Sequence, residues 1–166
     1  MTTLILMRHA KSDWSTPSEG DHDRPLNKRG QRSARALGDW LRKKGLHPKE
    51  ALVSSARRTQ ETWERLEVRS CRVWFLDDLY HASAAQMLAA LRRAEADPVL
   101  MIGHNPGIAA FAEEMVIGSE DIPMDFYAYP TCATSVITFP VKSWKQVAPG
   151  TGSLDDFVIP RELDIA

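Results

Sequence analysis

Long hydrophobic runs are absent from this sequence, and cysteine is scarce. No apolar stretch approaches the roughly 20 residues that a membrane-spanning helix needs, so no membrane partner is expected. Cys71 and Cys132 are far apart and form no CxxC pattern, which gives no indication of a disulfide framework or a cysteine zinc site. The first apolar run begins almost at the N-terminus and leaves no room for a signal peptide. We therefore expect a cytoplasmic protein.

An excess of charge of one sign is also lacking, because the net charge is only −1. The charges are unevenly distributed: residues 1–93 hold 18 Lys and Arg against 11 Asp and Glu, whereas residues 94–166 hold 3 against 11. Either this is a chance asymmetry of a solvated surface, or the field draws anionic substrates toward the N-terminal half. Because the pI is near 6.5 and no nucleic-acid module is recognisable, no nucleic-acid partner is expected.

What the sequence does contain is an alternation of short apolar runs with helical patterns. Four unbroken apolar runs are typical of strands buried on both faces of a sheet: residues 3–7, 51–53, 73–76 and 98–102. Residues 134–139 alternate like a further strand, with residues 144–147 as a candidate partner. The order predicts a single α/β domain over residues 1–166, a three-layer α/β/α sandwich with a mostly parallel sheet. The acidic tail from about residue 155 is of uncertain order.

Polar residues at the expected helix starts predict the caps. Asn27 suits the N-cap of a helix over residues 28–44, and Ser83 opens a capping box with Gln86 for a helix to about residue 96. Asn105 suits the N-cap of a helix that continues to about residue 117. Residues 13–25 are expected to form a polar binding loop or a mobile flap.

The helix that follows residues 51–53 carries an electrostatic conflict. Ser54 or Ser55 should cap it, and with Ser55 as cap the side chains of Arg57 and Arg58 fall in its first turn. Cations are disfavoured at this end of a helix, because its dipole is already positive there. A bound anion would repair the conflict, so the pattern favours an anion site.

Cationic or polar residues also follow other predicted strands. Arg8-His9 follows residues 3–7, His104 follows residues 98–102, and Asp78 follows residues 73–76. Ligands of open α/β sheets bind at the carboxyl ends of the strands, so these groups are expected to meet. Phosphoryl transfer needs a positioned nucleophile and fixed positive charge around the phosphoryl oxygens. Neutral imidazole can be that nucleophile near pH 7.

Three stretches of the chain resemble the motifs of the histidine phosphatase superfamily, the phosphoglycerate mutase-like group with an Arg-His-Gly signature. They are Met7-Arg8-His9-Ala10-Lys11-Ser12, Val53-Ser54-Ser55-Ala56-Arg57-Arg58-Thr59 and Ile102-Gly103-His104-Asn105. The small size and the stretch Arg24-Pro25-Leu26-Asn27 are similar to SixA-type phosphohistidine phosphatases. The likeness covers residues 3 to about 139, and the ordered set of three motifs is specific.

The resemblance implies a phosphatase that forms a covalent phosphohistidine intermediate on His9. Its catalytic residues would be His9, Arg8, Arg58 and His104, with Asp78 where many members place a glutamate acid. Its substrate-binding residues would be Lys11, Ser12, Asn105 and His81. Ala10 replaces the usual glycine, and the shorter side chain of Asp78 puts its acid role in doubt.

The favoured substrate is phosphohistidine on a partner protein. Small phosphomonoesters, or phosphate capture without turnover, are the alternatives. No cofactor is expected. The cluster Asp21, His22 and Asp23 is interpreted as part of a solvated loop, and a metal site there is the weaker interpretation. Trp40, Trp63 and Trp74 are expected in the core, and the oligomeric state stays open.

Overall fold

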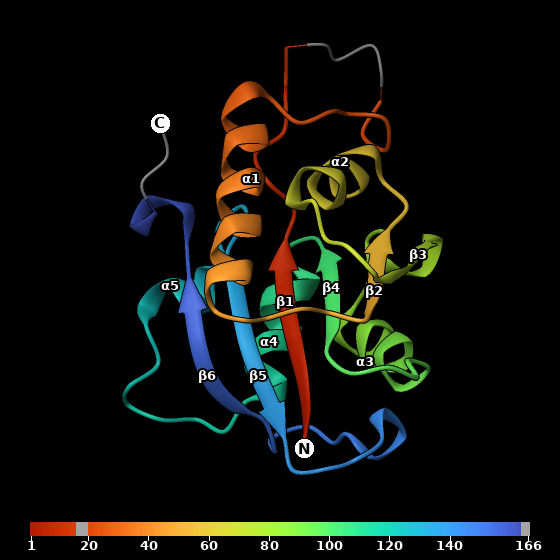
Figure 1. Ribbon diagram of the computed structural model, residues 1–166, viewed down its shortest axis with the longest axis vertical. Coiled ribbons are helices and arrows are strands. Elements are labelled where there is room, and N and C mark those ends of the chain that lie inside the picture. The colour runs from red at the N-terminus through yellow and green to blue at the C-terminus, as the bar shows by residue number, and fades with distance from the viewer. Residues whose placement is uncertain (16–19, 164–166) are drawn as a thin grey trace.

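Each predicted apolar run forms a strand of one sheet in the computed structural model, which describes residues 1–15 and 20–163 (Figure 1). Within these residues the sheet has six strands, in the order β3-β2-β4-β1-β5-β6. The strands are β1 (Thr2–Arg8), β2 (Glu50–Ser54), β3 (Arg72–Leu76), β4 (Val99–Gly103), β5 (Thr134–Phe139) and β6 (Ser153–Val158). β1 pairs with β4 in parallel and with β5 in antiparallel orientation, so the predicted mostly parallel α/β fold is confirmed.

Helices cover both faces of this sheet (Figure 1). They are α1 (Lys28–Lys43), α2 (Arg57–Leu66), α3 (Ala84–Arg92), α4 (Gly107–Met115) and α5 (Met124–Ala128), with short 3₁₀ turns η2 (Asp77–Leu79), η3 (Trp144–Gln146) and η4 (Pro160–Glu162). α1 and α2 lie on one face, and α3 and α4 on the other. Among the described residues, no helix is long and apolar enough to cross a membrane.

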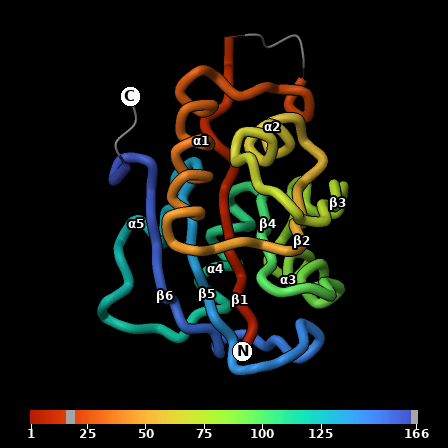
Figure 2. The backbone as a smooth tube through the Cα atoms, viewed as in Figure 1, coloured from red at the N-terminus to blue at the C-terminus, as the bar shows by residue number. Residues whose placement is uncertain are grey.

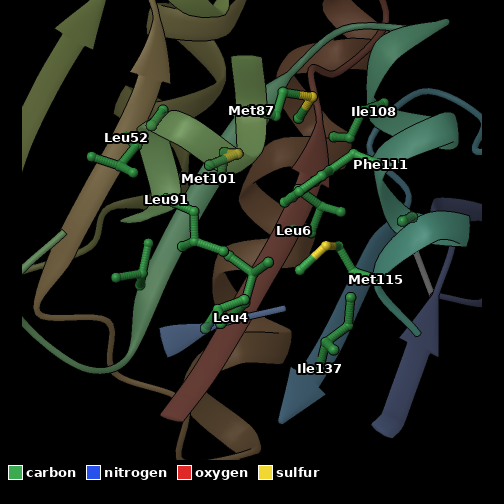
Figure 3. Close-up of a cluster of buried hydrophobic side chains, with 14 of the residues drawn as sticks. Leu4, Leu6, Leu52, Met87, Leu91, Met101, Ile108, Phe111, Met115 and Ile137 are labelled. Atoms are coloured by element: carbon green, nitrogen blue, oxygen red, sulfur yellow. The ribbon is translucent and has the colours of Figure 1, made fainter. Parts of the chain in front are cut away.

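Strand β1 separates two hydrophobic cores, because successive side chains of a strand point to opposite faces. Leu4 and Leu6 belong to the cluster beneath α3 and α4, which Figure 3 shows with Phe111 among its members. Ile5 and Met7 belong to the cluster beneath α1 and α2. The side chains of these four residues, 4 to 7, are fully buried. Burial on both faces is therefore the reason that the run at residues 3–7 does not alternate.

The chain path opens a crevice at the carboxyl ends of β1 and β4. Figure 2 traces the chain from β1 through α1 to β2, beyond the place that β4 later fills. The helix after β1 lies on one face of the sheet and the helix after β4 lies on the other. Where adjacent strands send their connections to opposite faces, the loops diverge and leave room for a ligand.

Two of the predicted caps are confirmed. The side chain of Asn27 accepts a hydrogen bond from the Gly30 amide at 2.7 Å at the start of α1. Ser83 and Gln86 form the capping box of α3. This helix ends at Arg92, earlier than the predicted residue 96.

The other two predicted caps are wrong. Helix α2 has Ala56 at its N-cap, whose methyl group cannot accept a hydrogen bond. Helix α4 has Pro106 at its N-cap and ends at Met115, not near residue 117. Ser55 and Asn105 use their side chains elsewhere, for contacts described with the site.

The C-terminal third departs most from the sequence prediction. Residues 144–146 form the turn η3, and the strand that pairs with β5 is β6, inside the predicted acidic tail. Besides its antiparallel pairing with β5, strand β6 is held by aromatic packing, because the Phe157 ring meets the rings of Phe126 and Tyr129 at 5.7 and 5.9 Å. Phe126 lies in the short helix α5. The tail's last residues, 164–166, lie outside the described residues.

The tryptophan prediction is also wrong in part. Trp74 is 46% exposed, because β3 is the edge strand of the sheet, while Trp40 and Trp63 are partly buried against the α1–α2 core. The predicted loop 13–25 includes residues 16–19, which lie outside the described residues. Its two ends are joined by the Asp13 amide, which donates to the Pro25 carbonyl at 2.8 Å.

Candidate active site

His9 stands one residue beyond the end of β1, held by main-chain bonds on both sides. Its amide donates to the Gly103 carbonyl of β4 at 3.1 Å, and its carbonyl accepts from the Cys132 amide at 2.9 Å. The side chain is only 5% exposed. These bonds fix the backbone of His9 at the crevice between β1 and β4.

The imidazole of His9 is oriented by its own neighbour. Nδ1 lies 2.7 Å from the Ala10 carbonyl oxygen, and because a carbonyl can only accept, Nδ1 must carry the proton. In the neutral ring the lone pair is then on Nε2. Burial lowers the pKa of His9 to about 3, with help from the charges of Arg8 and Arg58 and against the effect of the Ala10 carbonyl. His9 is therefore neutral near pH 7, the form that can act as a nucleophile.

His104 lies beside His9, one residue beyond the end of β4. The two rings have centroids 5.2 Å apart. His104 Nε2 lies 2.7 Å from Ser54 Oγ at the end of β2, while its Nδ1 is buried and has no hydrogen-bond partner among the described residues. Burial lowers the pKa of His104 to about 2, aided by the nearby His9 and Arg58. This ring is therefore a second neutral imidazole with one nitrogen unused.

Two guanidinium groups, that of the buried Arg58 and that of the partly buried Arg8, complete the site. Arg58, in the first turn of α2, is 4% exposed; its Nη1 donates to the Asp21 carbonyl at 2.7 Å and its Nη2 to Asp21 Oδ2 at 3.2 Å. Arg8 Nη1 donates to the Tyr129 carbonyl at 3.2 Å. The Nε atoms of both arginines are buried without a partner within the described part of the chain. Burial and then the charge of Arg58 lower the pKa of Arg8, so the pair is electrostatically suited to an anion.

Arg57 points to a different surface from Arg58. Its Nε donates to Glu61 Oε2 at 3.0 Å, one turn further along α2, and about half of its side chain is exposed. Both arginines do lie in the first turn of α2, as the sequence predicted. Only Arg58 is directed into the crevice.

Asp21 lies at the mouth of the site, a position that the sequence did not predict. Its carboxylate accepts hydrogen bonds from Arg24 Nη1 at 2.6 Å, from Arg58 and from the Tyr80 hydroxyl. Burial alone would raise the pKa of Asp21, but the hydrogen bonds from Tyr80 and Arg24 and the charge of Arg58 outweigh it, so the pKa falls below its usual range. The carboxylate is therefore ionised.

The arrangement around Asp21 is not that of a metal centre. In residues 1–15 and 20–163 no group of three His, Cys, Asp or Glu side chains is placed to hold a metal ion. His22 Nε2 lies 3.1 Å from Ser55 Oγ, and the Asp21 carboxylate is bound by arginines. The weaker interpretation of Asp21, His22 and Asp23 as metal ligands gains no support from this geometry.

Two of the residues expected to bind substrate have other partners at the site. Ser12 Oγ accepts from Arg24 Nε at 3.0 Å, so it orients Arg24. The Asn105 side-chain amide donates to the carbonyls of Ala128 and Tyr129, both at 3.0 Å. Each side chain therefore supports the wall of the site.

The remaining expected residues lie further out. Lys11 is exposed, while its carbonyl accepts from the Asn27 amide at 3.0 Å. His81 Nε2 lies 3.8 Å from Asp21 Oδ2 at the mouth. Asp78 Oδ2 lies 3.4 Å from Arg93 Nη2, so its carboxylate is turned toward the end of α3.

Sequence reasoning considered Ser54 as a helix cap and Arg24 as part of a SixA-like stretch, but it placed neither of them in the site. It gave no role to Tyr80, and it assigned Asp21 only to the metal hypothesis. A local signal existed for Asp21 and Arg24, which form an ion pair three residues apart just before Pro25. Tyr80 is recognisable only from the fold, because it meets Asp21 from a loop 59 residues away in sequence.

Comparison with known proteins agrees with this geometry. A model of the histidine phosphatase superfamily (branch 1) matches residues 4–80. A protein assigned as the phosphohistidine phosphatase SixA of Nakamurella multipartitia is similar in structure, with a TM-score of 0.82 and 29% identity over 96% of both chains. The corresponding Agrobacterium tumefaciens protein has a TM-score of 0.77 and 28% identity, over 96% of this chain and 98% of that one. An uncharacterised Mycobacterium tuberculosis protein is 29% identical, over 93% of this chain and all of its own length.

The three motifs, the sheet and these similarities agree on one class of protein: residues 4–80 match the histidine phosphatase superfamily, and the chain as a whole is similar in fold to its SixA-type members. It is a phosphatase with a histidine-based mechanism. The similarity to SixA-type structures confirms the resemblance seen in the sequence.

Proposed function

We propose that this protein removes the phosphoryl group from phosphohistidine on a partner protein, through a covalent intermediate on His9. The observation that carries the proposal is the bond from His9 Nδ1 to the Ala10 carbonyl, which leaves the lone pair on Nε2 of a neutral, buried ring. Nε2 attacks phosphorus and displaces the leaving group. Water then hydrolyses the phosphorylated His9. In this proposal residues 1–166 act as a single domain.

Charge on the phosphoryl oxygens is balanced by protein groups in this proposal. The unpartnered Nε–H groups of Arg8 and Arg58 and the unpartnered Nδ1 of His104 are the available contacts. Hydrogen bonds from such preorganised donors act where charge develops in the transition state. The proposal therefore includes no metal cofactor. Lys11 and His81 line the mouth, and Ser12 and Asn105 support the walls.

Phosphohistidine is favoured over alkyl phosphomonoesters by the leaving-group chemistry. An alkoxide needs a well-placed general acid, worth roughly 10²–10⁴-fold in rate, whereas a ring nitrogen leaves with little help. Asp78, the candidate acid, has its carboxylate beside Arg93. The SixA-type relatives assigned as phosphohistidine phosphatases support the same substrate class.

An open site favours a substrate carried on a protein. Only 45 residues separate Arg58 from His104, and they contain the rest of α2, then β3, η2, α3 and β4. That interval therefore contains no helical insertion that could roof the crevice. A phosphate on a bulky partner can approach such a site.

The test is a labelling experiment with a protein that carries ³²P-phosphohistidine. The wild-type protein should release phosphate and show, after brief mixing, an acid-labile and base-stable label on His9. His9→Ala should lose both, whereas His47→Ala, which removes an exposed histidine, should retain both. Full turnover by His9→Ala would overturn the mechanism.

A substrate panel distinguishes the alternatives. Preference for alkyl phosphomonoesters, with Asp78 essential for them, would replace the phosphohistidine proposal by a small-molecule phosphatase. Tight binding of the phosphorylated protein without release of phosphate would instead indicate a binding module.

A further inference from the structure

The burial of the site residues defines where a leaving group must lie. In-line displacement places the leaving atom opposite the attacking nitrogen. His9 and Arg58 are 5% and 4% exposed and form the floor of the crevice. The Asp21 side chain is 42% exposed and lies between Arg58 and solvent. A leaving group that points from this floor toward solvent on the Arg58 side would lie beside Asp21.

The mouth on this side combines an anion with an aromatic surface. The Tyr80 hydroxyl donates to the Asp21 carboxylate, and the Tyr80 ring lies 5.6 Å from the ring of His104 at the floor. The His81 ring lies against Tyr80 with centroids 4.0 Å apart, and its Nε2 is 3.8 Å from Asp21 Oδ2. The imidazole of His81, tilted by 48° to the Tyr80 ring, therefore lies beside both that ring and the Asp21 carboxylate.

We propose that Asp21 and Tyr80 form the receptor for the leaving imidazole of the substrate, and that they select for an N-phosphorylated ring. Asp21 accepts a hydrogen bond from the N–H on the far side of the phosphorylated ring, and Tyr80 stacks on that ring. The proposal rests on the proposed function, because it assumes phosphohistidine as the substrate. A carboxylate at this place disfavours leaving groups that depart as anions.

The step balances in atoms and charge. The substrate ring reacts as a phosphoimidazolium, with one nitrogen bonded to phosphorus and the other protonated and bound to Asp21. His9 Nε2 forms a bond to phosphorus as the N–P bond of the substrate breaks, and that electron pair returns to the substrate ring. The substrate ring leaves as neutral imidazole. His9 becomes a phosphoimidazolium whose Nδ1–H is held by the Ala10 carbonyl, so the two rings exchange roles.

The test compares Asp21→Asn with the wild type on two small substrates, phosphoimidazole and p-nitrophenyl phosphate. Asparagine keeps an oxygen for Arg58 Nη2, and the main-chain carbonyl of residue 21 still accepts from Arg58 Nη1. We expect kcat/KM for phosphoimidazole to fall about 10- to 100-fold, the effect of losing one charge-assisted hydrogen bond. For p-nitrophenyl phosphate, which expels an anion and makes no hydrogen bond to residue 21 as it leaves, kcat/KM should fall clearly less.

Two controls separate leaving-group recognition from a structural effect. Asp23→Asn makes the same change in charge at an exposed neighbour and should leave the ratio of the two kcat/KM values unchanged. Inhibition by inorganic phosphate, which has no leaving group, should be equal in Asp21→Asn and wild type. Tyr80→Leu should lower kcat/KM for phosphoimidazole more than for p-nitrophenyl phosphate.

Each outcome has a distinct meaning. Equal losses on both substrates with weaker phosphate inhibition would overturn the inference, because Asp21 would then serve only to position Arg58. An unchanged substrate ratio would overturn it as well. If the wild-type protein turned over neither phosphoimidazole nor a phosphohistidine protein, the proposed function itself would fail, and that result is visible before any variant is made.

Discussion

Ser54 Oγ lies 2.7 Å from His104 Nε2 at a fully buried position at the end of β2. The same oxygen accepts the Ala56 amide at 3.4 Å, so the hydroxyl proton is available for His104. With Nε2 as the acceptor, the proton of the neutral His104 ring is on Nδ1. The buried, unpartnered Nδ1–H is then a donor for a phosphoryl oxygen.

Ser54→Ala should therefore reduce activity without affecting His9. Loss of the hydroxyl frees the His104 ring to turn and to change tautomer, and we expect kcat/KM to fall about 10-fold, less than for full loss of a transition-state donor. Ser55→Ala removes the neighbouring hydroxyl, which contacts His22, and should change kcat/KM less than about twofold. Steady-state kinetics of both variants provide the measurement; equal losses would contradict the role of Ser54.

Arg58 and Arg57 should differ strongly, although they are adjacent. Arg58→Ala removes a buried donor of the site, so kcat/KM should fall about 10²–10³-fold. Arg57→Ala removes the contact with Glu61, and a half-exposed ion pair contributes little, about 0–1 kcal/mol, to stability. Kinetics with a phosphohistidine substrate would decide the point. A larger loss for Arg57→Ala would mean that the second motif has been aligned wrongly.

Activity should survive exhaustive treatment with EDTA, because the arginines supply the positive charge in the proposed mechanism. The measurement is phosphate release before and after chelation and dialysis. A loss that Mg²⁺, Mn²⁺ or Zn²⁺ restores would show that a metal takes part.

Acid should destabilise the folded protein through its buried histidines. His9 has a pKa of about 3 when folded and about 6.5 when unfolded. Between these values the unfolded chain binds a proton that the folded protein does not, so the free energy of unfolding falls as the pH is lowered. The loss is at most about 1.4 kcal/mol per pH unit for each such histidine.

Denaturant unfolding of the wild type, His9→Gln and His47→Gln at pH 7.5 and pH 5 would measure this effect. His9→Gln should show the weaker pH dependence, and His47→Gln should behave like the wild type. Identical pH dependence in all three proteins would contradict the buried neutral state of His9.

Gly30→Ala should destabilise the fold beside the site. A Cβ atom at residue 30 would lie 2.1 Å from the Lys11 carbonyl oxygen, where α1 packs on the segment that follows His9. Such overpacking costs about 1–3 kcal/mol, or roughly 2–12 °C in Tm for a chain of this size. Gly118→Ala is the matched control, since a Cβ there meets nothing within 4 Å. Thermal unfolding gives the comparison, and equal Tm values would contradict the close approach.

Strands β1 to β5 and the strand-end residues of the site were predictable because their signals are local. An apolar run buried on both faces is recognisable without knowledge of its neighbours, and Arg8, His9 and His104 follow such runs directly. The Asn27 cap was predictable for the same reason, because its side chain bonds within its own helix.

The remaining caps and the end of the chain depend on tertiary partners that no local pattern reveals. The Ser55 hydroxyl is at His22, and the Asn105 amide is bound to the carbonyls of Ala128 and Tyr129, so neither caps a helix. Strand β6 was hidden by its acidic side chains, because its pairing with β5 and the packing of the Phe157 ring against α5 are both long-range contacts.

The mouth of the site was not predictable as a unit. Asp21 and Tyr80 belong to separate loops that meet only when the β1 and β3 ends are brought together by the sheet. The sequence favoured a solvated cluster there, with a metal site as the weaker interpretation. Only the contacts to Arg24 and Arg58 show the carboxylate as part of the anion site.

The division of the site between strand ends and loops has a consequence for how such a protein can diversify. His9 and His104 continue strands that are packed into both cores, so a change there disturbs folding and chemistry together. Asp21 and Tyr80 lie in short connecting segments and can be exchanged without touching either core. New leaving groups can therefore be acquired by replacing residues 20–24 and the residues around Leu79, which itself belongs to the core, while the reacting histidine keeps its place. One scaffold thus has a route to many substrates, and protein engineers have a small region to randomise.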